Sequence, residues 1–543
     1  MFKKNDIIPL KIESVTGEGS GVGHADGIAV FVPMTAAGDE LKVRIVKVQK
    51  SYCYGIIEEL LVPSPDRIPA DCACYKRCGG CSLRHITYEA ELREKTGWVR
   101  DAMKRIGGYE MEPLPILPSP CHDRYRNKAQ FPFGRNENGC YTGFFAPRSH
   151  TVIPCRDCPL QPALFSEIAG WVCRYADAHG ITVYDEGTGK GLLRHLYLRQ
   201  AAIDGRVMLC LIINGSRLPD ADEFARQVQE AFPKVSTVIL NHNTRRDNVI
   251  LGKEQTVLAG PGTLQDTLCG ISVALSPNSF YQVNHDAAEQ LYREAARLAD
   301  LKPEETLLDL YCGAGTIGLS MVRPGQKLIG VEVVPGAVEN ARENARRAGV
   351  TDAEFICGDA GRAATILAAR GLRPDVVVLD PPRKGCDNVT LQAVVQMAPG
   401  RIVMVSCNPA TMARDAAALR DMGYILQCCR PVDLFPRTAH CETVVLLSKG
   451  EIDSKKVRVE FSLEDMDMSG FQKGATYEQI KAYVLEHSGL KVSSLYISQI
   501  KRKCGLEVGQ NYNLSKKEDA KVPQCPPEKE SAIREALKFY NLI

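Results

Sequence analysis

The sequence lacks the long apolar stretches of a membrane protein. No segment reaches the roughly 18 uninterrupted apolar residues that a membrane helix needs, and residues 1–6 are not followed by the apolar core of a secretory signal. It also lacks a charge bias, because 67 basic and 65 acidic residues give a formal net charge of +2. A nucleic-acid surface must therefore be a local patch. We expect a cytoplasmic protein that does not enter a membrane and works as a monomer.

The length of the chain indicates several domains. At about 150 residues per domain, 543 residues suggest three or four, and 45% hydrophobic with 24% charged residues is a globular composition. Strand-forming runs separated by glycines predict a small all-β barrel over residues 1–62. Basic residues of one run, at 42–50, precede Tyr52 and Tyr54, which suits RNA because phosphates attract charge and bases stack on rings. An ordinary solvated strand face explains these charges equally well.

Cysteine is plentiful, with 21 residues. A reducing cytoplasm keeps thiols from forming a disulfide framework, so clustered cysteines should be ligands or catalysts. Four thiols lie within residues 72–81, and Cys155 and Cys158 form a second short pair. All-thiolate ligation suits zinc or an iron-sulfur cluster, and the spacing leaves both open. The sequence thus predicts a metal site near the start of a domain that spans residues 63–270.

The remainder of this central region is expected to be an α+β domain. Residues 88–106 have the apolar stripe of a scaffold helix, and residues 207–213 and 222–231 read as a strand and a helix. Residues 124–128 hold three cations and a tyrosine at a strand entry. They either contact phosphates or are plain surface charge.

From residue 271 onward, expected strands and helices alternate, which is typical of a Rossmann-like, mostly parallel sheet covered by helices. A helix reaching residue 299 opens this domain, which we expect to end near residue 450. The expected buried strands lie at residues 306–310, 328–333, 354–357 and 376–379.

A glycine-rich turn at residues 311–318 follows the first of these strands. Its glycines, Gly313 among them, allow the backbone to approach a ligand closely, and such a turn also fits a dinucleotide. Glu332 ends the second strand, where a carboxylate can accept both ribose hydroxyls, and Asp359 follows the third, within reach of an adenine amine. Asp380, followed by two prolines, closes the fourth strand, where it would lie beside the sulfonium of a bound S-adenosylmethionine. A dehydrogenase has no reason for that last motif, so S-adenosylmethionine is favoured.

The next apolar run, at residues 403–406, stops at Cys407. Because Asn408-Pro409 forces a turn, the thiol should stand at the carboxyl end of a strand, where open α/β sheets hold their chemistry. Cys407 is the candidate nucleophile, and the alternative is a small buried residue that closes the strand. Arg383 stands where enzymes that methylate exocyclic amines carry an aromatic residue, which favours methylation at carbon.

The motif at residues 406–411, with residues 413–415 and 440–444 downstream, resembles the RNA uracil-C5 methyltransferase family over about residues 1–449. The resemblance implies methyl transfer from S-adenosylmethionine to carbon 5 of a uridine. Cys407 would add to carbon 6, and Glu442, otherwise a surface glutamate on a last strand, would remove the carbon 5 proton. The positions implied to contact the methyl donor are Gln282, Tyr311, Glu332 and Asp380.

The same resemblance interprets the amino-terminal half. Residues 17–23 and 30–33 look like a TRAM domain, an oligonucleotide-binding type of barrel, which favours RNA binding there. The cysteine spacing is similar to the [4Fe-4S] site of ribosomal-RNA-type members, while Cys74 and Cys155 have no counterpart in it. The implied cluster ligands are Cys72, Cys78, Cys81 and Cys158.

These features lead us to expect 23S ribosomal RNA as substrate, since tRNA-specific relatives usually lack the cluster cysteines. The target base should be unpaired or bulged, because flipping a base out of a helix costs a few kcal/mol. Two alternatives stay open: a tRNA uridine C5-methyltransferase, and a non-catalytic iron-sulfur protein that binds RNA.

Residues 451–543 lie beyond the usual chain of this family. We expect a tether with at most one strand at 457–461, then a helix from a capping box at Thr476 to a stop at Gly489. A second helix, 495–503, should be capped by Ser493. The pair resembles a helix-turn-helix with a basic end, which predicts either RNA contact or a small accessory domain with a solvated basic helix end.

Overall fold

The computed structural model describes residues 2–450, 477–504 and 525–539. It divides into two compact units, Met1–Glu451 and Ile452–Ile543, which we describe separately. Across the described residues, no helix combines the length and apolar character needed to cross a membrane.

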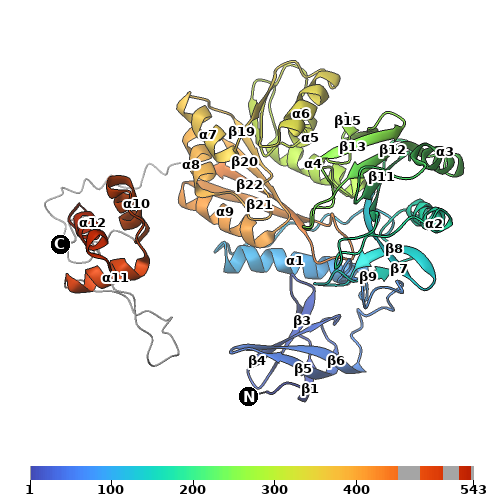
Figure 1. The fold of residues 1–543 in the computed structure, drawn as a ribbon. Helices are drawn as coiled ribbons and strands as arrows, with labels where there is room; N and C mark the ends of the chain where they lie inside the picture. The colour runs from blue at the N-terminus through green and yellow to red at the C-terminus, as the bar shows by residue number, and fades with distance from the viewer. Residues whose placement is uncertain (1, 451–476, 505–524, 540–543) are drawn as a thin grey trace. The chain divides into compact units, whose positions relative to one another are not determined.

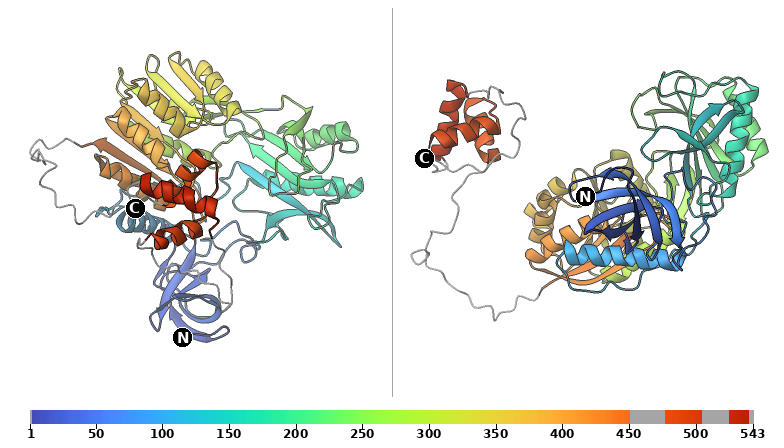
Figure 2. Two further views of the ribbon diagram at one scale, coloured as in Figure 1. Left: turned by 60° about the vertical axis from the view of Figure 1, so that its left-hand side comes forward. Right: turned by 90° about the horizontal axis from the view of Figure 1, so that it is seen from below.

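The first unit begins with an N-terminal β domain, a six-stranded sheet in the order β1-β5-β6-β4-β3-β2. Alternate residues of its strands, such as Leu41, Val43 and Ile45 in β5, are fully buried in its core. Figure 2 shows this domain next to α1 (Tyr88–Arg105), where Trp98 Nε1 donates to the Val15 carbonyl at 2.6 Å. The strands are β1 (Ile7–Lys11), β2 (Ser14–Val15), β3 (Ser20–Ala25), β4 (Ile28–Pro33), β5 (Glu40–Val48) and β6 (Tyr52–Val62).

The central domain is a seven-stranded sheet in the order β13-β12-β11-β10-β7-β8-β9. Helices α2 (Ala163–Ala178) and α3 (Ala221–Ala231) pack on one face, and the other face joins the core of the next domain. Its middle strands β10 and β11 are therefore buried on both sides, and β11 is a continuous apolar run. The strands are β7 (Lys128–Asn136), β8 (Gly139–Phe145), β9 (Val152–Pro154), β10 (Leu193–Gln200), β11 (Val207–Ile213), β12 (Val235–His242) and β13 (Glu254–Ala259).

A two-stranded hairpin, β14 (Leu264–Leu268) and β15 (Ile271–Leu275), follows the central sheet. Its turn residues Cys269 and Gly270 both have positive φ, 50° and 80°, as a tight two-residue turn requires. The domain boundary predicted at residue 270 falls within this hairpin, whose strands pack in the core that the central sheet shares with the following domain, and it stays a prediction.

That domain contains a seven-stranded sheet in the order β18-β17-β16-β19-β20-β22-β21, in which β22 alone runs antiparallel to its neighbours. Three helices cover one face, and three more cover the other together with α1 (Figure 1). Neighbouring strand residues point to opposite layers: Leu307 packs with the first set and Leu308 with the second. The strands are β16 (Thr306–Leu310), β17 (Lys327–Glu332), β18 (Ala353–Cys357), β19 (Val376–Leu379), β20 (Arg401–Ser406), β21 (Tyr424–Val432) and β22 (Glu442–Lys449); the helices are α4 (His285–Ala299), α5 (Thr316–Met321) and α6 (Pro335–Arg347) on the first face and α7 (Ala360–Ala369), α8 (Asn388–Met397) and α9 (Pro409–Asp421) on the second.

The second unit contains three described helices, α10 (Tyr477–Ser488), α11 (Ser494–Lys503) and α12 (Pro527–Phe539), around a small apolar core. The predicted stop at Gly489, with φ of 68°, and the predicted cap are confirmed, since Ser493 Oγ accepts from the Tyr496 amide at 3.3 Å. Helix α12 was not predicted. Thr476 and residues 457–461 lie outside the described residues.

Candidate active site

A cavity of about 980 Å³ lies at the carboxyl ends of the parallel strands. This edge is the one at which open α/β sheets bind ligands. Both predicted catalytic residues and all six predicted methyl-donor positions line it. They are Gln282, Tyr311, Gly313, Glu332, Asp359, Asp380, Cys407 and Glu442.

The turn after β16 supplies the floor of the expected methyl-donor site. Tyr311, Gly313 and Gly315 have φ of 67°, 56° and 78°, and the chain then enters α5. Glu332, at the end of β17, is held by this turn: its Oε2 accepts from the Gly313 amide at 3.1 Å and its Oε1 from the Val334 amide at 2.8 Å. The carboxylate is thereby fixed at the edge of the cavity before any ligand arrives.

The other two acids follow the ends of β18 and β19. Asp359 caps α7, with Oδ1 accepting from the Arg362 amide at 3.1 Å. Asp380 follows β19 and faces the cavity, and its withdrawal from water raises its pKa to about 7. Carboxylates gathered in one cavity suit a cationic ligand, because a nearby positive charge favours their ionised form.

One acid was missed by the sequence reasoning. Asp309 lies inside β16, its Oδ2 accepts from the Gly318 amide at 3.0 Å, and it is 1% exposed. Burial, and the charges of Asp380 and Glu332, raise its pKa to about 8. A lone acid within the apolar run 306–310 was the signal that could have indicated it.

Cys407 comes directly after β20, as predicted. Ser406 of β20 pairs with Thr443 of the antiparallel strand β22. Cys407 follows Ser406 and Glu442 precedes Thr443, so the two residues lie next to each other at the same end of the sheet. Asn408 caps α9 with its side-chain oxygen accepting from the Ala410 amide at 3.0 Å. The turn predicted after the cysteine therefore starts a helix.

The loop after β19 is attached to this turn. Asn408 Nδ2 donates to the Arg383 carbonyl at 3.3 Å, and the Thr411 hydroxyl lies 3.3 Å from the same oxygen. This fixes the backbone at Arg383, whose side chain lines the cavity with Cys407. In the sequence, Arg383 was noted only as a position without an aromatic residue, and the effect of its charge on the Cys407 thiol was not predicted.

The charge of Arg383 lowers the pKa values of Cys407 and Glu442, which their other surroundings raise. Burial and the Glu442 carboxylate raise the pKa of the Cys407 thiol, while the Arg383 guanidinium lowers it. Burial and Asp380 raise the pKa of Glu442 to about 8, and Arg383 again lowers it. His440, 3.4 Å from Arg383, is neutral at pH 7, because burial and that cation lower its pKa to about 4.

A second cavity, of about 260 Å³, is lined by the six clustered thiols. In the described part of the chain, no three or more His, Cys, Asp or Glu side chains meet the geometry of a metal site. Arg126 and Lys128 line both cavities, so the start of β7 separates them. Burial, with Arg199 and Arg126 nearby, lowers the pKa of Lys128 to about 8.

The six thiols differ in their backbone contacts. Cys74 Sγ donates to the Pro154 carbonyl at 3.2 Å, and Cys155 Sγ lies 3.4 Å from the Asp157 carbonyl. In contrast, Cys78 Sγ accepts from the Gly80 amide at 3.3 Å. An accepting sulfur is suited to the thiolate form that binds metal, whereas a donating one is occupied as a thiol.

Two predicted phosphate contacts look different in the structure. Lys42 and Arg44 of the basic run are ion-paired with Glu59 and Glu58 of the adjacent strand, so these two cations have carboxylate partners within the domain. Arg124 is bonded to Asp157 at 2.6 Å and to two backbone carbonyls.

Aromatic rings remain accessible on the N-terminal β domain. Phe31, Tyr52 and Tyr54 lie within 5.9 Å of one another by ring centroids, and Tyr54 is 40% exposed. Exposed rings of this kind are stacking surfaces for unpaired bases.

Two family descriptions match the chain. The description "tRNA (Uracil-5-)-methyltransferase" matches residues 269–450, and "TRAM domain" matches residues 2–57. The first of these ranges contains the whole large cavity apart from Arg126 and Lys128.

Similar proteins cover most of the chain. A protein of Halalkalibacterium halodurans named an uncharacterized RNA methyltransferase is 41% identical over 447 residues, covering 82% of this chain and 97% of that protein. A Bacillus cereus protein of the same description is 40% identical over 450 residues, covering 83% and 98%. Among solved structures, the Pyrococcus abyssi tRNA (uracil-54, C5)-methyltransferase in complex with S-adenosyl-L-homocysteine is 27% identical, with a TM-score of 0.66 over 81% of this chain and 99% of that one.

Proposed function

This chain belongs to the RNA uracil-C5 methyltransferase family and is an S-adenosylmethionine-dependent RNA methyltransferase, and we propose that it methylates carbon 5 of a uridine in 23S ribosomal RNA through a covalent cysteine adduct. The observation that carries the proposal is that Cys407 and Glu442 line the same cavity as the methyl-donor acids, at the end of the sheet where Ser406 pairs with Thr443.

In the proposed mechanism Cys407 is the nucleophile. Its thiolate adds to carbon 6 of the uracil ring, and the electron pair of the carbon 5–carbon 6 double bond moves to form an enolate. Carbon 5 then attacks the methyl group that S-adenosylmethionine supplies, the methyl–sulfur bond breaks with its electron pair left on sulfur, and S-adenosylhomocysteine leaves. Carbon 5 now carries both a methyl group and its original hydrogen. Glu442 takes that hydrogen as a proton, and the returning electron pair expels the thiolate and restores the double bond.

The charges around the cavity fit these roles. A carboxylate with a pKa of about 8 is a stronger base than an exposed glutamate, which suits Glu442 to remove a proton from carbon. Arg383 favours the thiolate form of Cys407. The sulfonium of a bound methyl donor would add a positive charge, besides that of Arg383, close to Asp380. This charge would favour the ionised forms of Cys407, Glu442 and Asp380. The proposed methyl-donor contacts are Gln282, Tyr311, Gly313, Glu332, Asp359 and Asp380.

We also propose a [4Fe-4S] cluster in the smaller cavity, held by Cys72, Cys78, Cys81 and Cys158. The donor set supports it, because a cluster of this kind needs four thiolates and the cavity is lined by six. Cys78 accepts an amide hydrogen bond, while Cys74 and Cys155 are engaged with carbonyls, which supports leaving these two out. A bound cluster would supply a rigid crosslink between residues 72–81 and Cys158.

A tRNA substrate is the second candidate. It is favoured by the family description that matches residues 269–450 and by the Pyrococcus abyssi protein, whose name gives tRNA as its substrate. The cluster cysteines favour ribosomal RNA instead, through the family resemblance.

The test is nucleoside mass spectrometry of 23S ribosomal RNA and tRNA from a deletion strain that carries either wild-type enzyme, Cys407→Ala or Cys121→Ala. Cys121 is exposed and lies outside both cavities, so it is the matched control. We expect 5-methyluridine in 23S ribosomal RNA with wild-type and Cys121→Ala enzyme and none with Cys407→Ala. Substantial methylation by Cys407→Ala would exclude covalent catalysis by this thiol, and restoration confined to tRNA would establish the second candidate.

A further inference from the structure

The loop of residues 433–441, between β21 and β22, leads directly into Glu442. We refer to it as the base loop. Asp433, Leu434, Arg437, Thr438 and Cys441 are buried within it. Although it has no regular secondary structure, the loop is held along its length by groups from distant parts of the chain.

Its first half is fixed by three elements. Lys95 of α1 donates to Asp433 Oδ1 at 2.6 Å and to the Phe435 carbonyl at 3.1 Å. The Tyr125 hydroxyl donates to the Pro436 carbonyl at 3.0 Å, and Asn284 Nδ2 donates to the Leu434 carbonyl at 3.0 Å. These backbone positions therefore depend on α1, on the segment that precedes β7 and on the residue that caps α4.

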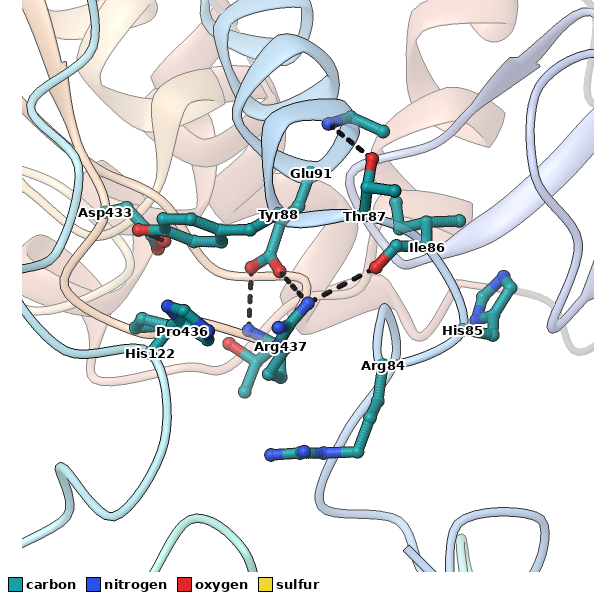
Figure 3. A network of polar contacts seen from close by, with 12 residues as sticks. Arg84, His85, Ile86, Thr87, Tyr88, Glu91, His122, Asp433, Pro436 and Arg437 are labelled. Atoms are coloured by element: carbon teal, nitrogen blue, oxygen red, sulfur yellow. Dashed lines mark hydrogen bonds and ion pairs between the residues drawn. The ribbon is translucent and has the colours of Figure 1, made fainter. Parts of the chain in front are cut away.

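Arg437 is the centre of the second half (Figure 3). Its amide donates to Glu91 Oε1 at 2.7 Å, and its guanidinium Nη1 donates to the Ile86 carbonyl at 3.2 Å and lies 3.8 Å from Glu91 Oε2. The same guanidinium lies 5.7 Å from the Tyr88 ring centroid. With φ of 67°, Arg437 holds a backbone conformation that L residues seldom adopt, and these contacts stabilise it.

The carbonyl of Arg437 connects the base loop to the cysteine motif. It accepts from the amides of Ser82 and Leu83 at 2.9 and 3.1 Å, and these residues directly follow Cys81. The N-terminal β domain meets the same place. A side-chain carbon at Gly19 would lie 2.6 Å from Ser82 Cβ and 3.3 Å from Ala439 Cβ, so the turn is packed against both segments.

Arg437 lines neither of the two cavities, and neither do Glu91 and Lys95. Its guanidinium therefore does not reach a base or a methyl donor bound there. Any effect of Arg437 on the reaction has to pass through the backbone of the base loop.

We propose that Arg437 is a positioning residue, which places Glu442 for removal of the carbon 5 proton and links that placement to the segment after the cysteine motif. This rests on the proposed function, in which Glu442 is the base. In the proposed sequence of steps, Arg437 acts only after the methyl group has moved. Its loss should therefore slow elimination of the adduct and leave binding of the methyl donor unchanged.

The experiment compares wild-type enzyme with Arg437→Met, Arg420→Met and Glu442→Gln. Arg420 is a matched control, since its guanidinium also covers a tyrosine ring, Tyr109 at 5.1 Å, and donates to a backbone carbonyl, Gly107 at 2.7 Å, without touching the base loop. The substrate is full-length 23S ribosomal RNA transcribed with ordinary or carbon-5-deuterated uridine. Three readouts are taken: turnover, the covalent protein–RNA band on denaturing gels, and the stoichiometry of S-adenosylmethionine binding.

Arg437→Met should turn over about tenfold to a hundredfold more slowly, accumulate the covalent band and show a larger deuterium isotope effect than wild-type enzyme, at full S-adenosylmethionine stoichiometry. Arg420→Met should behave as wild-type enzyme. A wild-type isotope effect without adduct in Arg437→Met overturns the inference, even if turnover falls, because the residue then only supports the fold.

If Arg437→Met does not fold, Arg437→Lys and Arg420→Lys are compared by the same criteria. The Glu442→Gln variant separates the two proposals. If it traps the adduct but the Arg437 variants do not, the inference fails and the function stands. If it turns over normally, the base role fails and the inference falls with it.

Discussion

Removal of the Arg383 charge should make the nucleophile less reactive. Arg383 and Cys407 line the same cavity, and the Arg383 guanidinium lowers the pKa of the thiol, against burial and the Glu442 carboxylate, which raise it. In Arg383→Met the cation is gone and both opposing influences remain. The thiolate fraction of Cys407 should therefore fall at any given pH, and the pKa of Glu442 should rise above its value of about 8.

The size of the effect follows from the exposure of the arginine. An ion pair that involves a solvent-exposed side chain contributes about 0.2–1 kcal/mol. Arg383 is exposed, so solvent screens its interaction with the thiolate, and up to about 1 kcal/mol is the appropriate range. Since 1.4 kcal/mol corresponds to a factor of ten, we expect up to roughly a fivefold loss of thiolate at neutral pH. Raising the salt concentration should shrink the difference from wild-type enzyme.

The assay is alkylation by iodoacetamide between about pH 6.5 and 9.5, with the Cys407 peptide quantified by mass spectrometry against that of the exposed Cys121. Arg373→Met is the control, because Arg373 precedes β19 and Arg383 follows it, so one positive charge is removed at either end of the same strand. The Cys407 profile should move to higher pH only in Arg383→Met. Identical profiles in the two variants would refute the electrostatic role of Arg383.

Three further predictions concern stability, metal content and RNA binding. Glu442 has a pKa of about 8 in the folded chain and 4.5 when exposed, so between pH 4.5 and 8 the folded state binds more protons than the unfolded state and the stability of the protein falls as pH rises. Thermal midpoints of ligand-free protein should show this fall, and an equal fall in Glu442→Gln would contradict the raised pKa of Glu442. Anaerobically purified protein should contain iron and acid-labile sulfide that Cys72→Ser loses and Cys74→Ser keeps; zinc without iron would refute the cluster, and the opposite pattern of loss would identify other ligands. Deletion of residues 451–543 should weaken RNA binding and reduce its salt slope, whereas equal affinity and slope would mean that the segment does not contact RNA.

Buried strands were the most predictable part of the fold. The bounds predicted at 306–310, 376–379 and 207–213 agree with β16, β19 and β11 to the residue. Strands β19 and β11 are continuous apolar runs covered on both faces, and polar residues or turns mark the ends of all three strands. Helix α12 was missed because its few apolar residues, such as Ile533 and Leu537, are buried only by packing against the other helices of its unit.

Ion pairs between distant residues could not be predicted. Lys42 and Arg44 looked like an open basic face because the strand register that brings Glu59 and Glu58 beside them is a tertiary property. The same holds for the base loop: Glu91 and Arg437 are separated by 346 residues, and neither has a sequence neighbour that indicates the other. The motif at residues 440–444 indicated Glu442 itself, but not what holds it.

The meeting of Cys407 and Glu442 depends on the direction of a single strand. Cys407 follows the last residue of β20, whereas Glu442 is the first residue of β22. If β22 ran parallel to β20, its first residue would lie at the opposite edge of the sheet, about 20 Å away for a six-residue strand at about 3.3 Å per residue. Because β22 alone runs antiparallel, a residue at a strand start faces a residue at a strand end. The base loop leads the chain into β22 at that edge. Its contacts with α1 and with the segment after the cysteine motif therefore help to determine where Glu442 lies relative to Cys407.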